Sequence, residues 1–402
     1  MTILPTVLRG QMRKSVFLAG FDGSTGYNKH GKWFDHVAAT GHDRTVEQDY
    51  EALSKIGIRA VRDTVRWPLV DLGRGRYDFS TVDPLVRASE RYQICVIWDL
   101  FHYGFPDKLD LLSSAFAHRF ADYCHAVARY LRSRMAGTLW FTPVNEPSFM
   151  AHAAGEVGLF APWLSGRGYD LKVALVEAAI AGINAIRAVD PAARMVNADP
   201  VCRVVRPDRR FELEEEVEDF NQRLVFQAWD MLCGRLLPEL GGSPAHLDVV
   251  GINYYWTNQW EWKALANADG IVPPLSEDDP RRLSLEDLVR SVWRRYGAEV
   301  MISETAHIGD QRGPWVHELE RCARVITADG IPLRGICLYP IQSMPEWHSP
   351  DVWIPLGLWE PPCNEQGPDR RVICGPMLKA LEDVHARTSR DAAYSVVPPA
   401  LI

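Results

Sequence analysis

The stretch FTPVNEP, at residues 141–147, is an apolar run that ends abruptly in an amide, a carboxylate and a proline. A buried strand has little physical reason to finish on Asn145 and Glu146, because burying an unpaired polar group costs free energy. A second apolar run, EVMISET at 299–305, also leads to a glutamate, Glu304. The function of these two carboxylates depends on how the strands that carry them are arranged.

Apolar runs of this kind recur along the whole chain, rich in Val, Ile and aromatic residues. They are VFLAGF (16–21), IRAVRDTVRW (58–67), QICVIWDLF (93–101), TLWFTPVN (138–145), RMVNAD (194–199), LDVVGINYY (247–255), EVMISE (299–304) and RGICLYP (334–340). They lack a clean alternation of apolar and polar residues, which is typical of parallel strands covered on both faces. Helical patterns lie between them, and the clearest has apolar residues at steps of three and four: Phe116, Phe120, Tyr123, Val127 and Tyr130.

Eight strand–helix units over about 380 residues predict an α/β fold, a single (β/α)8 TIM barrel. The 402-residue chain is also long enough for two ordinary domains. An open doubly wound sheet is disfavoured because no GxGxxG or P-loop motif follows the first strand. We expect the barrel over residues 15–386, an N-terminal arm at 1–14 and a C-terminal arm at 387–402. Long, functional loops are expected after strands six and eight, at 257–282 and 341–373.

The composition excludes several classes of function. With 44 basic and 52 acidic residues the net charge is −8, which argues against nucleic acid as the main partner. No apolar run approaches the ~20 residues that span a bilayer, and the start of the chain does not resemble a secretion signal. The eight cysteines include no CxxC pair, so neither a zinc site nor a disulfide framework is indicated. We expect a cytoplasmic protein with reduced cysteines, no metal and no cofactor, and the sequence leaves its oligomeric state open.

Polar and aromatic residues cluster where the predicted strands end, which is where barrel enzymes build their sites. If strands four and seven face each other across the barrel mouth, Glu146 and Glu304 share a cleft. Two carboxyl groups flanking a bond are what glycoside hydrolysis requires, one to protonate the departing oxygen and one to attack or activate water. The alternative is that each glutamate only caps a strand end at the surface. A metal site is disfavoured because groupings such as His102 with Asp99 lack zinc-like spacing.

Several of these strand ends resemble motifs of one family. FTPVNEP is similar to the TFNEP-type strand-four motif of glycoside hydrolase family 1, the β-glucosidase group of retaining TIM-barrel glycosidases. MISET resembles the family's ITENG-type strand-seven motif. Four more family motifs are matched in the same order by AVRDTVRW (60–67), LFHYGFP (100–106), GINYY (251–255) and MPEW (344–347). The resemblance covers roughly residues 15 to 385 and implies a carbohydrate or glycoside substrate.

The resemblance also implies a role for each matched residue. Glu304 would be the nucleophile, with Tyr255 supporting it, and Glu146 would be the acid/base. Asn145 would hold the sugar 2-hydroxyl. The complete set of predicted substrate-binding residues is Arg62, His102, Asn145, Asn253, Tyr255, Tyr339, Glu346 and Trp347.

Physical chemistry sets conditions on these roles. Glu304 must be ionised to attack an anomeric carbon, a state that a nearby Arg62 would favour. Glu146 must begin protonated, which requires poorly solvated surroundings and the negative field of Glu304. The structural alternatives are that Arg62 pairs with Asp63 or Asp99, that His102 is a satisfied core histidine, and that Tyr255 and the tryptophans only pack.

Three departures from the family pattern concern recognition of the sugar. The family's first strand ends in a Gln followed by an acidic residue, whereas GFDGSTGYNKHG (20–31) offers only Asn28. Thr305-Ala306 replaces the Asn-Gly that follows the nucleophile. Tyr339 replaces the strand-eight Trp and precedes a proline, Pro340, so we predict a cis bond between them with the Tyr339 ring at the cleft wall.

The two glutamates are therefore present while the surrounding recognition residues are altered. We predict a retaining β-glycoside hydrolase or transglycosidase that acts on something other than a plain glucoside. In a retaining enzyme the carboxyl groups of Glu146 and Glu304 would lie ~5 Å apart. The alternative is a non-catalytic carbohydrate-binding protein built on the same barrel.

Overall fold

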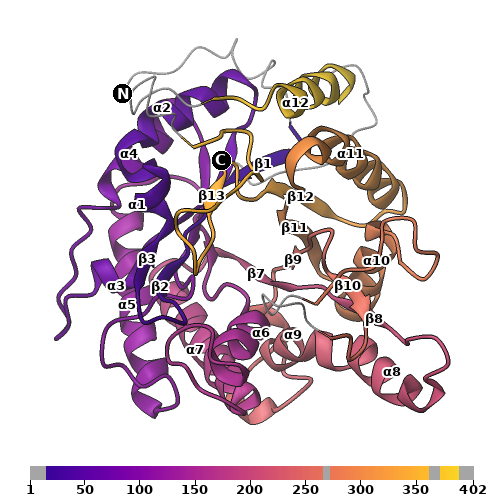
Figure 1. Ribbon diagram of the computed structural model, residues 1–402. Helices are drawn as coiled ribbons and strands as arrows, with labels where there is room; N and C mark the ends of the chain where they lie inside the picture. The colour runs from indigo at the N-terminus through magenta and orange to yellow at the C-terminus, as the bar shows by residue number, and fades with distance from the viewer. Residues whose placement is uncertain (1–14, 266–271, 362–371, 389–402) are drawn as a thin grey trace.

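The computed structural model describes residues 15–265, 272–361 and 372–388. Eight parallel strands close into a barrel, with helices packed around its outside (Figure 1). Each strand pairs with its neighbours in chain order, and the last closes on the first. The barrel strands are β1 (Phe17–Gly20), β4 (Ala60–Thr64), β5 (Cys95–Asp99), β6 (Trp140–Thr142), β7 (Arg194–Pro200), β9 (Val249–Asn253), β11 (Glu299–Thr305) and β12 (Leu333–Leu338).

Each of the eight barrel strands lies within one predicted apolar run or extends one residue beyond it, so the predicted (β/α)8 barrel is confirmed. The helices are α1 (His36–Thr40), α2 (His42–Lys55), α3 (Trp67–Val70), α4 (Asp83–Tyr92), α5 (Ser114–Arg132), α6 (Pro147–Met150), α7 (Gly168–Val189), α8 (Glu214–Gln222), α9 (Gln227–Leu232), α10 (Leu285–Tyr296), α11 (Arg312–Ala328) and α12 (Gly375–Thr388). The clearest predicted helical pattern is α5. The N-terminal arm predicted at 1–14 lies outside the described residues, as does most of the predicted C-terminal arm.

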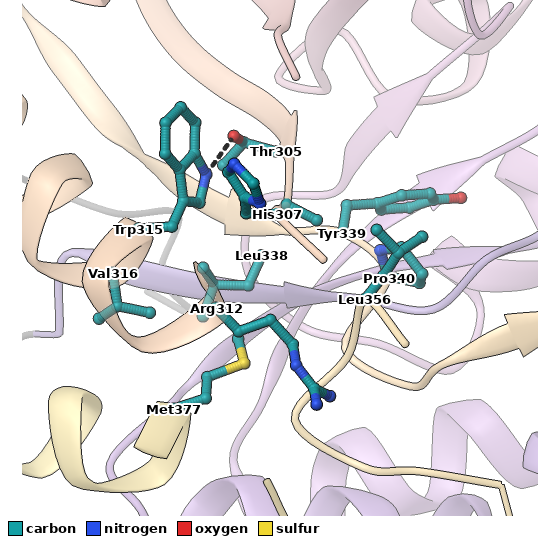
Figure 2. A pocket seen from close by; sticks show the side chains of 11 residues that line it. Thr305, His307, Arg312, Trp315, Val316, Leu338, Tyr339, Pro340, Leu356 and Met377 are labelled. Carbon is teal, nitrogen blue, oxygen red and sulfur yellow. Dashed lines mark hydrogen bonds between the residues drawn. The ribbon is translucent and has the colours of Figure 1, made fainter. Parts of the chain in front are cut away.

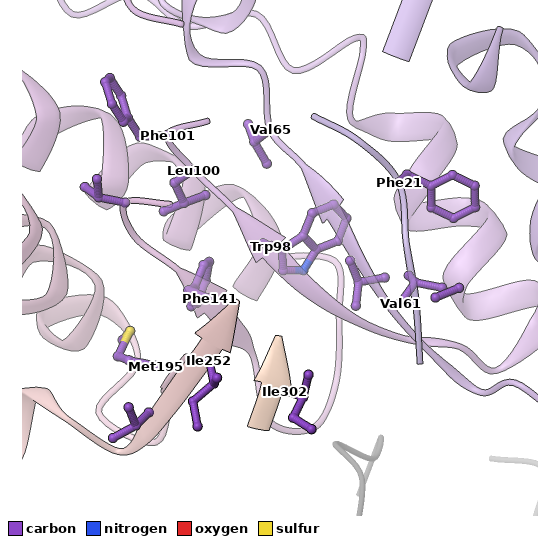
Figure 3. Packing of buried hydrophobic residues seen from close by; sticks show 14 of the residues in the cluster. Phe21, Val61, Val65, Trp98, Leu100, Phe101, Phe141, Met195, Ile252 and Ile302 are labelled. Carbon is purple, nitrogen blue, oxygen red and sulfur yellow. The ribbon is translucent and has the colours of Figure 1, made fainter. Parts of the chain in front are cut away.

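The core has two layers because successive strand residues point to opposite faces. One set fills the barrel interior and includes Leu18, Ile97 and Met301. The other set lies between the strands and the surrounding helices and is the larger cluster (Figure 3). Along β5, for example, Ile97 belongs to the interior cluster and Trp98 to the outer one. The same alternation turns the charged residues near the strand ends either into the mouth or towards a helix.

Short antiparallel sheets follow the carboxyl ends of strands. One pairs β2 (Thr25–Tyr27) with β3 (Trp33–Asp35), directly after β1. Another pairs β13 (Met344–Pro345) with β14 (Trp353–Ile354), in the segment that follows β12. A third, parallel pair joins β8 (Arg203–Val205) to β10 (Gln259–Glu261). The two predicted long loops therefore contain β10 and the β13–β14 pair.

Among the described residues, no helix is long and apolar enough to cross a membrane. The seven cysteines that the structure describes are free thiols, and six of them are buried. Cys95 and Cys337 lie in barrel strands, while Cys124 and Cys322 lie in α5 and α11. Across the described ranges, no three His, Cys, Asp or Glu side chains are grouped so that they could hold a metal ion.

Candidate active site

The centre of the candidate site is Arg62, in the middle of β4 and only 1% exposed. Its Nη1 donates to Oε1 of Glu304 at 2.6 Å. Its Nη2 donates to Oδ2 of Asp99 and to Oδ1 of Asn145, both at 2.6 Å. One buried guanidinium thus connects β4 with the ends of β5 and β11 and with the residues after β6. The alternative pairing with Asp63 is excluded, because that carboxylate points outward and bonds His42 and Tyr50 of α2.

Local backbone irregularities let neighbouring residues face the mouth together. In a regular strand, adjacent side chains point to opposite faces. Glu146 has a left-handed backbone with φ 49°, so Asn145 and Glu146 both reach the site. Tyr103 has φ 69°, and its ring lies 4.7 Å from that of His102. These are single non-glycine residues in a region that costs free energy, and such strain clusters at functional sites.

The third irregularity is in β11. The register of β11 against β9 shifts between Ile302 and Glu304, as in a β-bulge. Bulges re-aim side chains near active sites. Here Ser303 donates to Oδ1 of Asn253 at 2.6 Å while the adjacent Glu304 bonds Arg62 and Tyr255. Two consecutive side chains are therefore both used at the mouth.

Glu304 is held by donors on both oxygens. Arg62 donates to Oε1, and the Tyr255 hydroxyl donates to Oε2 at 2.9 Å. The side chain is buried, with the residue 4% exposed. The predicted contacts of Glu304 with Arg62 and with Tyr255 are therefore both present. A carboxylate held in this way has a fixed direction, which a nucleophile requires.

Glu146 has comparable burial, with the residue 8% exposed, but its side-chain partners are neutral. Nδ2 of Asn253 donates to Oε1 at 2.9 Å, and the Tyr103 hydroxyl donates to Oε2 at 2.6 Å. Burial and the charge of Glu304 raise the pKa of Glu146 to about 8, although the bonds from Tyr103 and Asn253 oppose the rise. This side chain is therefore suited to hold a proton near neutral pH.

A relay of hydrogen bonds orients Asn145 and His102. Nδ1 of His102 lies 2.8 Å from Oδ2 of Asp99, and its Nε2 lies 3.1 Å from Nδ2 of Asn145. Because Oδ1 of Asn145 accepts from Arg62, its Nδ2 must be the end that faces the imidazole. An amide N–H needs an acceptor, so this network fits a neutral His102 that donates from Nδ1 to Asp99. Burial lowers the pKa of His102, but Asp99 and nearby carboxylates together raise it by more. The N–H of Asn145 that faces Nε2 opposes protonation of that nitrogen.

Tyr339 directly follows β12, at the mouth of the barrel. Its peptide bond to Pro340 is cis, as predicted. The ring is 5.9 Å from the His102 ring and parallel to it, and the hydroxyl accepts from the backbone N–H of Gly23 at 3.2 Å. A side chain at Gly20 would collide with the ring, so glycine is needed there. That Tyr339 contacts a sugar stays a prediction.

Behind this ring lies a cavity of about 10 Å³, large enough for about one water molecule. In Figure 2 the phenol of Tyr339 points away from the side chains of Thr305 and Trp315, which lie on the other side of the cavity. Oγ1 of Thr305 accepts from Nε1 of Trp315 of α11 at 3.0 Å. The Thr305 that replaces the family's Asn therefore packs outward against a helix.

Glu346 and Trp347 lie just beyond β13 and are both half-buried. Oε2 of Glu346 accepts from the backbone N–H of His348 at 2.8 Å, an interaction within its own loop. The Trp347 ring lies 6.2 Å from that of Tyr103, and the backbone carbonyl of Trp347 accepts from Asn28 at 3.0 Å. Asn28 is thus engaged in holding this loop. Sugar binding by Glu346 and Trp347 stays a prediction.

Four other tryptophans in or next to the long loops have packing partners of their own. Trp256 stacks on His307 at 4.6 Å, and Trp359 is buried in the core. Trp260 and Trp262 pack against Phe220. Packing, the structural alternative, accounts for these four residues.

The structure brings together Arg62, His102, Asn145, Glu146, Asn253, Tyr255 and Glu304 in one hydrogen-bonded cluster. Sequence reasoning missed Tyr103 and Ser303. Both are adjacent to residues that it singled out. The signal for Tyr103 was Gly104, because a glycine directly after a site residue indicates a turn or a close backbone approach.

No known family model matches the chain, and no protein of curated function matches it. Solved structures do. The AHE enzyme from Alicyclobacillus herbarius has a TM-score of 0.73 and 17% identity, with 92% of this chain and 97% of that chain covered. A β-glucosidase from Thermotoga maritima in complex with glucoimidazole has a TM-score of 0.73 and 14% identity, with 92% and 98% covered. A family 1 β-glucosidase from the same organism has a TM-score of 0.72, 15% identity, and 92% and 97% covered. The chain therefore has the fold of the family 1 β-glucosidases at low sequence identity.

Proposed function

We propose that this chain is a retaining β-glycosidase, a hydrolase or transglycosidase that works through a covalent glycosyl-enzyme intermediate on Glu304. The supporting observation is that two buried glutamates share one network, yet only Glu304 has a charged partner. Glu304 accepts from a guanidinium and a phenol, whereas Glu146 accepts from an amide and a phenol and has a raised pKa. Two carboxyl groups in contrasting environments are the usual arrangement for dividing nucleophile and acid.

In the first step, Oε2 or Oε1 of Glu304 attacks the anomeric carbon while the protonated Glu146 gives its proton to the departing oxygen. In the second step, Glu146 takes a proton from water, or from an acceptor alcohol, as that oxygen attacks the anomeric carbon and displaces Glu304. The side-chain amide of Asn145 is held by Arg62 and His102, and in this scheme it interacts with the sugar 2-hydroxyl. This scheme requires the two carboxyl groups to be ~5 Å apart.

The altered recognition residues support a substrate other than a plain glucoside. Asn28, the only side chain that could replace the family's first-strand Gln, already bonds the Trp347 carbonyl and accepts from two backbone N–H groups. Glu346 accepts from its own loop. Tyr339 presents a smaller ring than Trp. The glycone is therefore expected to differ from glucose in the hydroxyls farthest from the anomeric carbon.

Incubation with a panel of 2-deoxy-2-fluoro glycosides that carry activated leaving groups tests the proposal. We expect one sugar to give a stable mass adduct that peptide mapping places on Glu304. The same panel with Glu304→Gln is the control and is expected to remain unlabelled. Turnover without any adduct, or an adduct on another residue, would contradict the assignment.

A non-catalytic carbohydrate-binding protein on the same barrel is the second candidate, and it is motivated by the same altered recognition residues. It predicts saturable binding of a sugar, measured by calorimetry, with no adduct and no turnover for any member of the panel. Binding alone does not require the proton-holding environment of Glu146, which favours the enzyme.

A further inference from the structure

Tyr103 is a buried residue of the site to which the resemblance assigns no role. Its hydroxyl donates to Oε2 of Glu146 at 2.6 Å, near the short end of the range for O–H···O bonds. The ring is buried between Phe160, stacked at 5.9 Å, and Phe149 at 5.5 Å, and its edge contacts Trp347. The phenol is therefore held on three sides and has little freedom to leave Glu146.

The backbone conformation around Tyr103 fixes the direction of its side chain. Tyr103 adopts φ 69°, which turns its ring to the same side as the preceding His102. The next residue, Gly104, lies so close to Thr25 that any side chain there would collide with it. The backbone of this segment is also tied to β2, because Thr25 donates its N–H to the carbonyl of His102 at 3.2 Å. A tyrosine in a left-handed conformation persists only where its surroundings compensate for the strain.

We propose, resting on the proposed function, that Tyr103 is the positioning residue of the acid/base: its O–H holds Oε2 of Glu146 and stabilises the carboxylate that remains after proton transfer. Each glutamate then has its own tyrosine, Tyr255 for Glu304 and Tyr103 for Glu146.

The proposal assigns Tyr103 a place in both steps. When Glu146 gives its proton to the departing oxygen and the C–O bond breaks, the carboxylate that forms accepts the Tyr103 O–H. When the carboxylate later takes a proton from the attacking water, that bond weakens again. Burial and the charge of Glu146 raise the pKa of Tyr103 well above its ordinary value, so the phenol remains protonated throughout. Tyr103 transfers no proton to substrate in this scheme.

The proton affinity of Glu146 is set by groups from several elements. The titratable groups that act on it or are acted on by it are Tyr103, Asp199 of β7, Cys202, Tyr255 and Glu304 of β11. Glu304 and Asp199 raise the pKa of Glu146, and the Tyr103 bond lowers it. Removing only the Tyr103 hydroxyl must therefore raise that pKa further, whereas loss of packing alone has no such directed effect.

The test is Tyr103→Phe, which keeps the ring and removes the hydroxyl. The matched control is Tyr123→Phe, which deletes another buried hydroxyl, donated to the Val65 carbonyl at 2.8 Å. The carboxyl group of Glu146 is titrated by NMR in protein carrying ¹³C-labelled glutamate, with Glu146→Gln assigning the signal. We expect Tyr103→Phe to raise its midpoint by about one pH unit, since a hydrogen bond to a charged group favours it roughly tenfold. Tyr123→Phe is expected to leave the midpoint unchanged.

This titration needs no turnover, so it separates the inference from the proposed function. If the 2-fluoro panel labels nothing but the midpoint moves, the proposed function fails and the Tyr103–Glu146 coupling stands. If a glycoside is turned over, the alkaline limb of kcat/KM is expected to move up by the same amount in Tyr103→Phe. An unmoved midpoint in a folded Tyr103→Phe protein, or an equal shift in Tyr123→Phe, overturns the inference.

Discussion

The surroundings of Glu304 and of Glu146 differ although the two side chains are the same and both are buried. Glu304 lies at the end of a chain of charged groups, with Arg62 between it and Asp99. Glu146 is bonded by an amide and a phenol, and its pKa is raised. The difference teaches that burial alone does not assign a carboxylate its chemistry. The partners that reach it decide which protonation state the site favours.

The largest expected effect is on Glu304. Glu304→Ala removes the proposed nucleophile, so turnover of every glycoside should fall by a factor on the order of 10⁴ or more. Steady-state kinetics on activated and unactivated substrates measure it. Glu299→Ala removes a carboxylate from the opposite end of the same strand and should leave turnover intact. Residual activity in Glu304→Ala close to that of wild type would contradict the role.

Glu146 should respond in a way that depends on the leaving group. Glu146→Ala is expected to slow substrates with poor leaving groups by roughly 10²–10⁴, because they depart only when protonated. Release of an activated phenol in the first turnover should be nearly unchanged, and added azide, which attacks without a base, should restore later turnovers. Pre-steady-state measurement of phenol release checks this. Equal losses on both kinds of substrate would contradict the role of Glu146 as the acid, because its effect would then match that of Glu304.

Arg62, the charged partner of Glu304, should contribute strongly to the stability of the protein. Arg62→Met leaves two buried carboxylates, Asp99 and Glu304, without their cation, so the free energy of unfolding should fall by about 3–5 kcal/mol. Arg119→Met, which breaks a partly exposed pair with Asp71, should cost roughly 1 kcal/mol or less. Urea unfolding of the two variants gives the ratio. Similar losses in both variants would mean that pairing the two buried carboxylates with Arg62 adds no more stability than a partly exposed ion pair does.

Glu146 should make the stability of the protein depend on pH. Its folded pKa, about 8, is raised above the ordinary 4.5, so it contributes stability below pH 4.5 that is lost as pH rises through 8. Relative to Glu146→Gln, the wild-type protein should therefore lose about 4 kcal/mol between pH 5 and pH 9. The amide replacement also loses one accepted hydrogen bond, which gives a constant offset. Thermal unfolding across pH measures the slope, and parallel curves would show that Glu146 has an ordinary pKa.

The placement of the two glutamates could be predicted from the sequence, because it depends on patterns within short segments. The runs that became β6 and β11 are short, apolar and bounded by polar residues, so their existence and their ends could be predicted. The mouth location of Asn145, Glu146 and Glu304 followed, because parallel strands of a barrel all end at the same face. The contact between Arg62 and Glu304 was predicted through the family motifs, and the structure has it.

Other features were not accessible, because they depend on exceptions to strand alternation. Tyr103 was passed over, since a residue next to His102 should point away from the site. Its left-handed backbone reverses that expectation, and the strain is held by contacts with Thr25 and Glu146 that are distant in the sequence. Ser303 was missed for the same reason, because the register shift in β11 turns it inward beside Glu304.

The sequence by itself determined the barrel, the order of its strands and the presence of a glutamate at the ends of the fourth and seventh, because apolar periodicity and strand length are properties of short segments. Tertiary structure alone decided which partners each glutamate received. Arg62 is 242 positions from Glu304 and Asn253 is 107 positions from Glu146, and only closure of the barrel brings them together. Protonation follows from those partners and from burial, and both exist only once the strands have met.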